Sequence, residues 1–200
     1  IIQLALFTGM RRGEICGLRW SDIDFEKSTI SVNRTSEWIP HEGIIFTPPK
    51  TKASNRTFKV GPNCMDLLRE YQLFQKAERL KVGSQWAKTV KIENGTTVQN
   101  DLLFTRWDGT PLDLNKVTTW FPIFLREHNL PEVTIHSLRH TYASLMIAAH
   151  VPVTTVSGRL GHARTSTTTD IYAGFIRTVD AAAADAMEGV FNRIREKNHA

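Results

Sequence analysis

Hydrophobic and polar positions divide the first 20 residues into two short helical segments. Residues 1–7, IIQLALF, are almost continuously apolar and stop at Thr8-Gly9, which predicts a buried helix that ends in a tight junction. A second helix is expected in residues 11–20, RRGEICGLRW, because its apolar residues have helical spacing. The junction therefore lies between two helices.

The pattern changes to extended segments after residue 21. Residues 28–32 (STISV) alternate polar and apolar side chains, and residues 43–47 (GIIFT) and 56–60 (RTFKV) are two further runs of this kind. These three runs predict one small antiparallel sheet. Between the second and third run, residues 48–55 (PPKTKASN) predict a polar hairpin tip, because proline is excluded from the centre of a strand.

Helical spacing dominates the remainder of the chain. Residues 82–100 are polar and predict a surface loop or a short excursion, and residues 101–105 (DLLFT) predict an extended segment. Helices are predicted at residues 62–81, 114–128, 136–149, 152–159 and 178–197. The expected fold class is α+β and mainly α: a helical domain with a small antiparallel three-stranded sheet.

Composition adds a domain count and a class of partner. The 200 residues with 41% hydrophobic content fit one well-filled domain over residues 1–200, with residues 178–200 as a C-terminal helical tail. A net charge of +5 and a pI of about 9.4 favour a polyanionic partner such as nucleic acid. No apolar run approaches the roughly 20 residues that a membrane-spanning helix needs.

The two cysteines and the first residue suggest where the chain works and what precedes it. Cys16 and Cys64 form no CxxC pair, so neither a disulfide framework nor a zinc ribbon is indicated, and a reducing cytosol is expected. The sequence starts without methionine inside an apolar stretch. We therefore expect a fragment whose N-terminal part is absent.

Residues 136–142, HSLRHTY, contain two histidines, an arginine and a tyrosine within seven positions. Helical spacing places His136, Arg139 and His140 on one face. Two histidines four residues apart resemble half of a zinc site, but the glutamate of an HExxH motif is missing and Arg139 would repel a cation. Taken alone, the segment leaves open a hydrogen-bonded core histidine and a grip on phosphate.

Four other fragments accompany this segment in a particular order. Arg11 follows the first helix in TGMRRGE, and Lys50 and Lys52 lie in PPKTK. Downstream, His162 stands in LGH and Tyr172 follows ten residues later. Each has an ordinary structural explanation by itself, as a surface charge, a solvated loop tip, a helix cap or a packed aromatic ring.

Together, the arginine of TGMR, a hairpin lysine, HSLRH, LGH and the following tyrosine resemble the catalytic domain of the tyrosine recombinases, the phage integrase family. The resemblance covers about residues 1–175, and PKTKASNRT is most similar to integrases of phages and conjugative transposons. It implies the DNA breaking-rejoining fold and that the absent N-terminal part is DNA-binding. It also implies a site-specific recombinase or integrase. Such an enzyme cleaves and rejoins DNA strands through a 3′-phosphotyrosyl intermediate, with no cofactor, metal or ATP.

The resemblance also assigns roles to the residues of this chain. Tyr172 would be the nucleophile, and Arg11 and Arg139 would clamp the nonbridging phosphate oxygens with their planar guanidinium groups. His136 would accept the phenol proton, and His162 would donate a hydrogen bond to a phosphate oxygen.

The leaving 5′-oxygen needs a proton, which a lysine on a flexible loop can supply. Lys50 is preferred because threonine follows it, and Lys52 remains an alternative. Glu14 and His140 are expected to support the arginines and the histidine.

The implied partners are double-stranded DNA at attachment or recombination sites, further copies of the protein in a tetrameric synapse, and an accessory excision or bending factor. The tail at residues 178–200 is expected to dock on a neighbouring protomer rather than on its own domain. The expected location is the cytoplasm of a bacterial or phage-infected cell, in association with the nucleoid. Two alternatives remain: a DNA-relaxing enzyme of the type IB topoisomerase class, and a DNA-binding module without catalysis.

Overall fold

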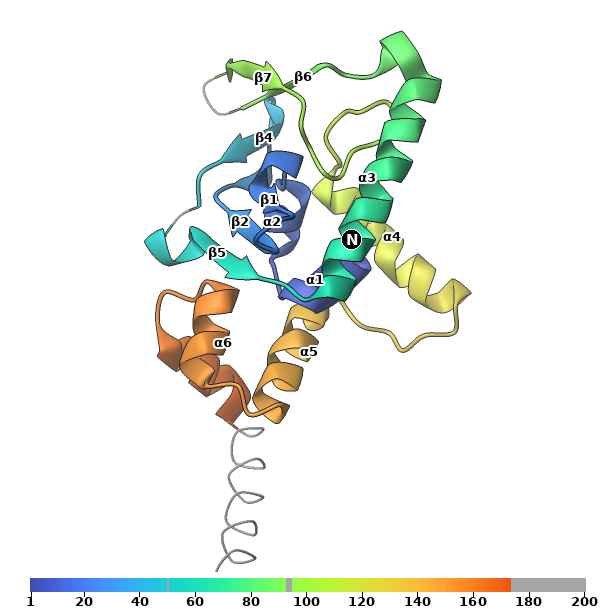
Figure 1. The fold of residues 1–200 in the computed structure, drawn as a ribbon. Coiled ribbons are helices and arrows are strands. Elements are labelled where there is room, and N and C mark those ends of the chain that lie inside the picture. The colour runs from blue at the N-terminus through green and yellow to red at the C-terminus, as the bar shows by residue number, and fades with distance from the viewer. Residues whose placement is uncertain (50, 93–94, 174–200) are drawn as a thin grey trace, which may run out of the picture.

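The computed structural model describes residues 1–49, 51–92 and 95–173. Six α-helices, α1 to α6, lie in these ranges, and residues 165–173 form a further helical segment (Figure 1). The helices are α1 (Ile2–Thr8), α2 (Arg12–Cys16), α3 (Pro62–Val82), α4 (Leu114–Glu127), α5 (Ile135–Ala148) and α6 (Val153–Leu160). Short 3-10 helices lie at Trp20–Asp22, Lys52–Ser54 and Gly83–Gln85. Every helix predicted within the described ranges is present, but the one predicted at residues 11–20 is α-helical only over Arg12–Cys16.

Three small antiparallel sheets accompany the helices, which confirms a mainly helical α+β fold. The largest has the order β1-β2-β5 and consists of β1 (Ile23–Asp24), β2 (Thr29–Val32) and β5 (Arg56–Lys59). The other two are hairpins: β3 (Thr35–Ile39) with β4 (Gly43–Thr47), and β6 (Thr89–Lys91) with β7 (Thr97–Gln99).

The predicted composition of the three-stranded sheet was wrong in one strand. Residues 28–32 and 56–60 do pair, with Ile30 opposite Phe58, but residues 43–47 pair with Thr35–Ile39 instead. A strand that follows its neighbour after a short turn loses less chain entropy by pairing with it than with a distant strand. Residues 48–55 therefore connect two sheets and are not the tip of a hairpin.

Two further segments differ from their predictions. Residues 82–100, predicted as a surface loop, contain the β6–β7 hairpin, which stands at the top of the molecule in Figure 1. Residues 101–105 take part in isolated bridges, such as that between Arg19 and Leu102, rather than in a strand. Short edge pairs carry too few alternating residues to be recognised from periodicity.

Two main clusters of buried apolar side chains hold the helices and the β1-β2-β5 sheet together, and a third, minor cluster of Phe46, Val90 and Leu102 joins β4 to β6. The larger one joins α1, α2, α3, α4 and the β1-β2-β5 sheet, and Ile15, Ile30 and Leu103 are completely buried in it. The smaller one joins α5, α6 and the helical segment 165–173, and it includes Tyr142 and Tyr172. Because Tyr172 packs into the smaller cluster, its position depends on α5 and α6.

The junction between α1 and α2 needs a glycine. Gly9 has a φ of 63°, and its N–H caps α1 by donating to the Ala5 carbonyl at 2.8 Å. A Cβ at this position would lie 2.4 Å from Cδ1 of Tyr142, so only glycine allows α5 to pack this closely. The chain therefore leaves α1 directly beside α5, and Arg11 starts the next helix there.

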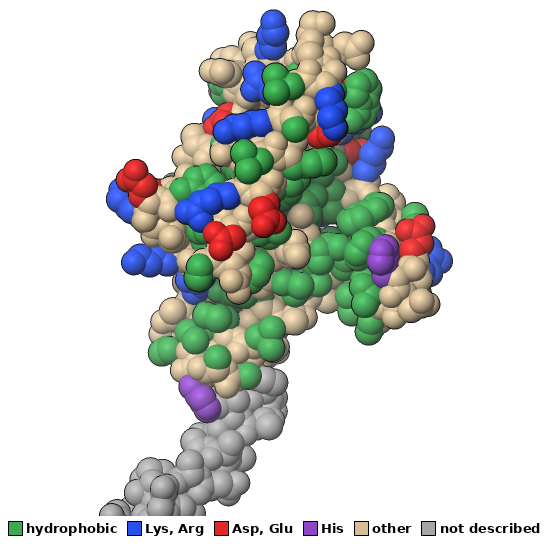
Figure 2. All heavy atoms as spheres, turned by 45° about the vertical axis from the view of Figure 1, so that its right-hand side comes forward, with side chains coloured by type: hydrophobic (Ala, Val, Ile, Leu, Met, Phe, Trp, Pro, Cys, Tyr) green, Lys and Arg blue, Asp and Glu red, His purple; other side chains and the backbone are tan. Residues whose placement is uncertain are grey.

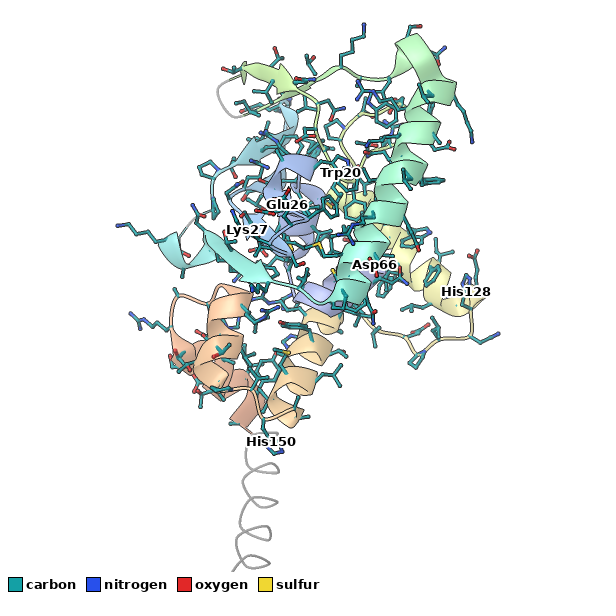
Figure 3. All side chains as sticks on the ribbon, viewed as in Figure 1. Trp20, Glu26, Lys27, Asp66, His128 and His150 are labelled. Atoms are coloured by element: carbon teal, nitrogen blue, oxygen red, sulfur yellow. The ribbon has the colours of Figure 1, made fainter. Side chains whose placement is uncertain are left out.

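Several polar and apolar side chains lie away from this junction. Figure 3 places His128 and His150 at the outer ends of α4 and α5, and Trp20 against α3, where its Nε1 donates to Gln75. Figure 2 shows apolar side chains gathered beside α4, where Tyr71, Trp120 and other residues line a hollow of about 500 Å³. None of the helices within the described ranges is both long and apolar enough to cross a membrane.

Candidate active site

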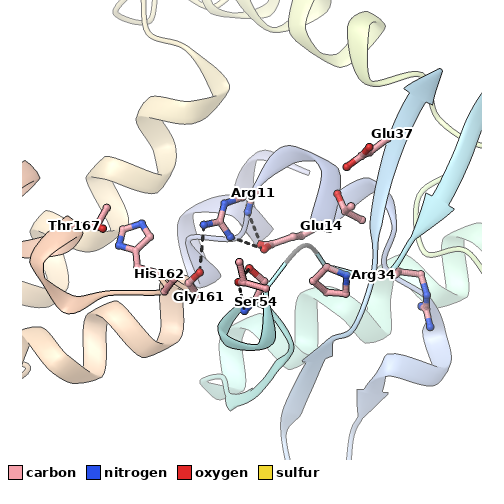
Figure 4. Close-up of a pocket in the computed structure, with 12 residues that line it drawn as sticks. Arg11, Glu14, Arg34, Glu37, Ser54, Gly161, His162 and Thr167 are labelled. Atoms are coloured by element: carbon pink, nitrogen blue, oxygen red, sulfur yellow. Dashed lines mark hydrogen bonds and ion pairs between the residues drawn. The ribbon is translucent and has the colours of Figure 1, made fainter. Parts of the chain in front are cut away.

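Arg11 is fixed by the way α2 begins. As N-cap residue it has extended backbone angles, and its own N–H donates to Oε2 of Glu14 at 2.8 Å. Its Nη1 donates to Oε1 of the same carboxylate at 2.9 Å, and its Nη2 donates to the Gly161 carbonyl at 3.3 Å (Figure 4). Glu14, at the third helical position, therefore both caps α2 and orients the Arg11 guanidinium.

A second arginine, Arg56 on β5, binds the same carboxylate from another side. Its Nη1 and Nη2 donate to Oε1 and Oε2 of Glu14 at 3.0 and 2.9 Å. Burial alone would raise the pKa of Glu14, but Arg56 and then Arg11 outweigh burial and hold the pKa below its usual value. The sequence interpretation missed Arg56. The available signal was a charged residue in the half-buried run RTFKV, because a buried charge needs a partner.

Arg139 on α5 is almost completely buried. Its Nη1 donates to the Gly9 carbonyl and its Nη2 to the Leu160 carbonyl, both at 2.8 Å. The guanidinium therefore ties the α1–α2 junction to the end of α6, and it still borders a cavity with its remaining surface. Burial, then Arg11, lower its pKa to about 10, so it stays charged at neutral pH.

The start of α5 places two histidines in contact. Thr134 caps the helix, its Oγ1 accepting from the Ser137 N–H at 3.1 Å. The rings of His136 and His140 then meet edge to face, with centroids 4.8 Å apart. Burial, followed by His140 and Arg139, lowers the pKa of His136. The prediction that His136 and His140 lie on one face of the helix is therefore confirmed.

His140, rather than His136, contacts the tyrosine. Nδ1 of His140 and the hydroxyl of Tyr172 are hydrogen-bonded at 2.9 Å. Tyr172 is only 6% exposed, and burial raises its pKa although Arg139 opposes this shift. His136 instead borders the cavity that Arg11 and Arg139 also line.

His162 follows the glycine that ends α6. Gly161 has a φ of 68°, and the chain then turns so that Nδ1 of His162 is hydrogen-bonded to Oγ1 of Thr168 at 2.7 Å. Burial, then Arg139 and Arg11, lower the pKa of His162 to about 4. The imidazole is therefore neutral at pH 7.

Two cavities meet at Arg11. One, of about 440 Å³, is bordered by the β4–β5 connection and by the turn that carries His162 (Figure 4). The other, of about 360 Å³, lies towards α5 and is bordered by His136 and Arg139. Arg11 thus lines both, and a bound anion can reach cationic groups on either side.

Of the two candidate lysines, the structure describes only Lys52. Lys50 lies outside the described residues, whereas its neighbours Pro49 and Thr51 both line the larger cavity. Lys52 is exposed in the 3-10 helix Lys52–Ser54, and among the described residues it lines neither of these two cavities. The choice between them stays a prediction.

Comparison with known proteins places the chain. The model of the phage integrase family matches residues 1–175. The chain belongs to the phage integrase family. This family member is 33% identical to the tyrosine recombinase XerC-like protein of Caldanaerobacter subterraneus subsp. tengcongensis, over 96% of this chain and 49% of that protein. It is 30% identical to an integrase of Streptomyces ambofaciens, over 96% of this chain and 48% of that protein.

The fold of this family member also matches solved structures. The integrase of transposon Tn1549, in complex with transposon right end DNA, superposes with a TM-score of 0.74 at 24% identity. The match covers 94% of this chain and 57% of that chain. The sequence therefore spans about half the length of the curated relatives that it matches.

The site of this integrase family member is strongly cationic. The guanidinium groups of Arg11 and Arg56 both bind the carboxylate of Glu14, and the charge of Arg139 interacts with it as well. Glu37 is a second carboxylate that lines the cavity beside Arg11. Within the described part of the chain, no three His, Cys, Asp or Glu residues gather in a group able to hold a metal ion. Such an arrangement suits an anionic group with spread charge, such as a phosphodiester.

Proposed function

We propose that the chain is the catalytic part of a tyrosine-type site-specific recombinase that cleaves and rejoins DNA through a 3′-phosphotyrosyl intermediate. One observation carries this proposal: in a member of the phage integrase family, the Tyr172 hydroxyl is bound to His140 beside the cationic groups Arg11 and Arg139. A nucleophile, a proton acceptor and a phosphate clamp thus come from three separate segments. The DNA in the Tn1549 integrase structure supports DNA as the substrate class.

The reaction needs charge stabilisation more than it needs a cofactor. The phenolic oxygen of Tyr172 attacks phosphorus, and the bond from phosphorus to the 5′-oxygen breaks. Negative charge on the nonbridging oxygens is met by Arg11 and Arg139. Loss of one such positioned donor typically costs about 2.7–4 kcal/mol, or a hundredfold to a thousandfold in rate.

Proton transfer completes the balance of the cleavage step. An imidazole accepts the phenol proton, and a lysine donates a proton to the departing 5′-oxygen. We choose Lys50 as this lysine because its neighbours Pro49 and Thr51 line the cavity. His140 is the imidazole that contacts the phenol. The role of His136 as acceptor stays a prediction, and its place at the cavity beside Arg11 equally suits a contact to the phosphate.

Covalent storage of the phosphodiester makes an energy source unnecessary. The phosphotyrosyl bond replaces one ester by another, so a 5′-hydroxyl can attack it and rejoin the strand. If that hydroxyl belongs to a partner duplex, strands are exchanged. We propose double-stranded recombination sites, a tetrameric synapse and an accessory excision or bending factor as partners, in association with the nucleoid.

The decisive test is covalent trapping. The full-length protein is incubated with nicked suicide duplexes that carry candidate attachment sites, and adducts that resist denaturation are counted on a gel. We expect an adduct with the wild type and none with Tyr172→Phe, since phenylalanine keeps the packing but lacks the attacking oxygen. An adduct formed by Tyr172→Phe would show that another residue is the nucleophile.

Strand exchange then separates the proposal from DNA relaxation alone. Two labelled duplexes that share a site should yield recombinant products with the wild type. Relaxation of supercoiled DNA without any recombinant product would identify a topoisomerase instead.

A further inference from the structure

We propose that Arg56 is the positioning residue that holds the lysine loop, Arg11 and the His162 turn in one geometry. This inference rests on the proposed recombinase function and adds a residue that acts from behind the cavity. The Arg56 side chain is 8% exposed, and among the described residues it is not one of those that line the cavity beside Arg11. Its guanidinium nevertheless bonds to three segments that all border this cavity.

The first contact orients Arg11. Glu14 receives two N–H groups from Arg56 and two from Arg11, so that both carboxylate oxygens are shared. A planar fork matches a carboxylate with two parallel bonds, which fixes its rotation as well as its position. Because the carboxylate cannot rotate, the Arg11 guanidinium is held towards the cavity.

The second contact fixes the turn that carries His162. Nε of Arg56 donates to the carbonyl of Arg159, in the last turn of α6, at 2.6 Å. Nη1 of Arg56 lies 2.9 Å from the place where a Cβ on Gly161 would stand. The guanidinium therefore packs directly against the backbone that leads into His162.

The third contact reaches the loop of the candidate lysines. Nη1 of Arg56 donates to the carbonyl of Ser54 at 3.0 Å. Ser54 in turn donates its N–H to Oγ1 of Thr51 at 3.3 Å, and both residues line the cavity. The loop end is thus tied to the same guanidinium as Glu14 and α6.

Lysine cannot replace this arrangement. A single ammonium group keeps the charge but lacks the rigid fork that reaches a carboxylate and two carbonyls at once. Removal of Arg56 is therefore expected to misplace the groups that contact phosphate without removing any of them. Misplacement by about 1 Å can cost about a hundredfold in rate.

The experiment measures cleavage and DNA binding separately. Single-turnover adduct formation on the suicide duplex, at saturating DNA, is compared for the full-length wild type, Arg56→Met and Arg56→Lys. We expect the cleavage rate to fall about a hundredfold in both variants, while the Kd for the duplex stays close to that of the wild type. Arg56→Lys keeps the charge and the alkyl stem, so it serves as the readout if Arg56→Met does not fold.

Two controls separate positioning from stability. Leu68→Ala opens a cavity in the core on α3, where Leu68 is 2% exposed, and lowers the Tm without touching the site. In a double-mutant cycle, Arg56→Met and Glu14→Gln should be strongly non-additive in cleavage rate, because both break the same network.

Three results would overturn the inference. The first is a cleavage rate that Leu68→Ala lowers as much as the Arg56 variants do. The second is additive effects on the cleavage rate in the double-mutant cycle, and the third is full cleavage activity of Arg56→Lys. A wild type that forms no Tyr172-dependent adduct would instead refute the proposed function, which tells the two failures apart.

Discussion

Which nitrogen of His162 carries the proton decides what this residue can do. Its pKa of about 4, lowered first by burial, leaves the ring neutral throughout the range from pH 5 to pH 8. A neutral imidazole has one N–H, and Thr168 shares a hydrogen bond with Nδ1. If the Thr168 hydroxyl donates to Nδ1, the proton stands on Nε2 and is free to bond to a phosphate oxygen.

We therefore predict that Thr168→Val lowers the single-turnover cleavage rate roughly tenfold, since a hydrogen bond that selects one tautomer is worth about 1–1.5 kcal/mol. Thr168→Ser keeps the hydroxyl and should cleave nearly as fast as the wild type. Nitrogen shifts of labelled His162 measure the tautomer directly. Unchanged cleavage by the valine variant would remove Thr168 from the mechanism.

At the scale of secondary structure, three of the candidate site residues lie at helix ends. Arg11 is the N-cap of α2, His136 lies in the first turn of α5, and His162 follows the C-cap of α6. Backbone groups at helix ends are free to bond with side chains, and the chain changes direction there. The caps therefore set the directions of these side chains.

The end of α6 supplies a prediction at this scale. Gly161 has a left-handed φ of 68°, and a Cβ there would lie only 2.9 Å from Nη1 of Arg56. Gly161→Ala should lower the free energy of unfolding by about 1–3 kcal/mol, through backbone strain and displacement of Arg56. Urea denaturation measures this change.

Gly158, inside the same helix, provides the matched control. A Cβ there meets nothing within 4 Å, so Gly158→Ala should stabilise the protein by about 0.4–1 kcal/mol. Equal effects of the two substitutions would contradict the role assigned to the α6 end.

At the scale of the whole molecule, the site exists only because separate parts of the fold meet. The α1–α2 junction, α5, α6 and the segment 165–173 converge through Arg139 and the smaller apolar cluster. Local distortion in one part therefore reaches the others. The C-terminal tail, predicted to dock on a neighbouring protomer, lies outside the described residues.

Deletion of residues 178–200 tests this docking. If the tail binds a neighbour in the assembled complex, the deletion should reduce recombination between two sites far more than adduct formation at one suicide site. Gel assays of both products, with one enzyme preparation, give the ratio. A comparable loss in both reactions would contradict docking between protomers.

Helical periods, the order of motifs and the glycine positions were all readable from the sequence, because they depend on local backbone preferences and on residue spacing. The helices 62–81, 114–128, 136–149 and 152–159 and the shared face of His136 and His140 follow from spacing alone. Resemblance to a family, carried by the same motifs, added the candidate site residues and the reaction.

The tertiary structure alone decided which side chains of the site contact one another. The hydrogen bond between His140 and Tyr172 and the bonds of Arg56 to Glu14 and to the Arg159 carbonyl join residues that are far apart in sequence. Such contacts depend on how helices and sheets pack around a common core, and a period of hydrophobic residues carries no information about the partner across that core.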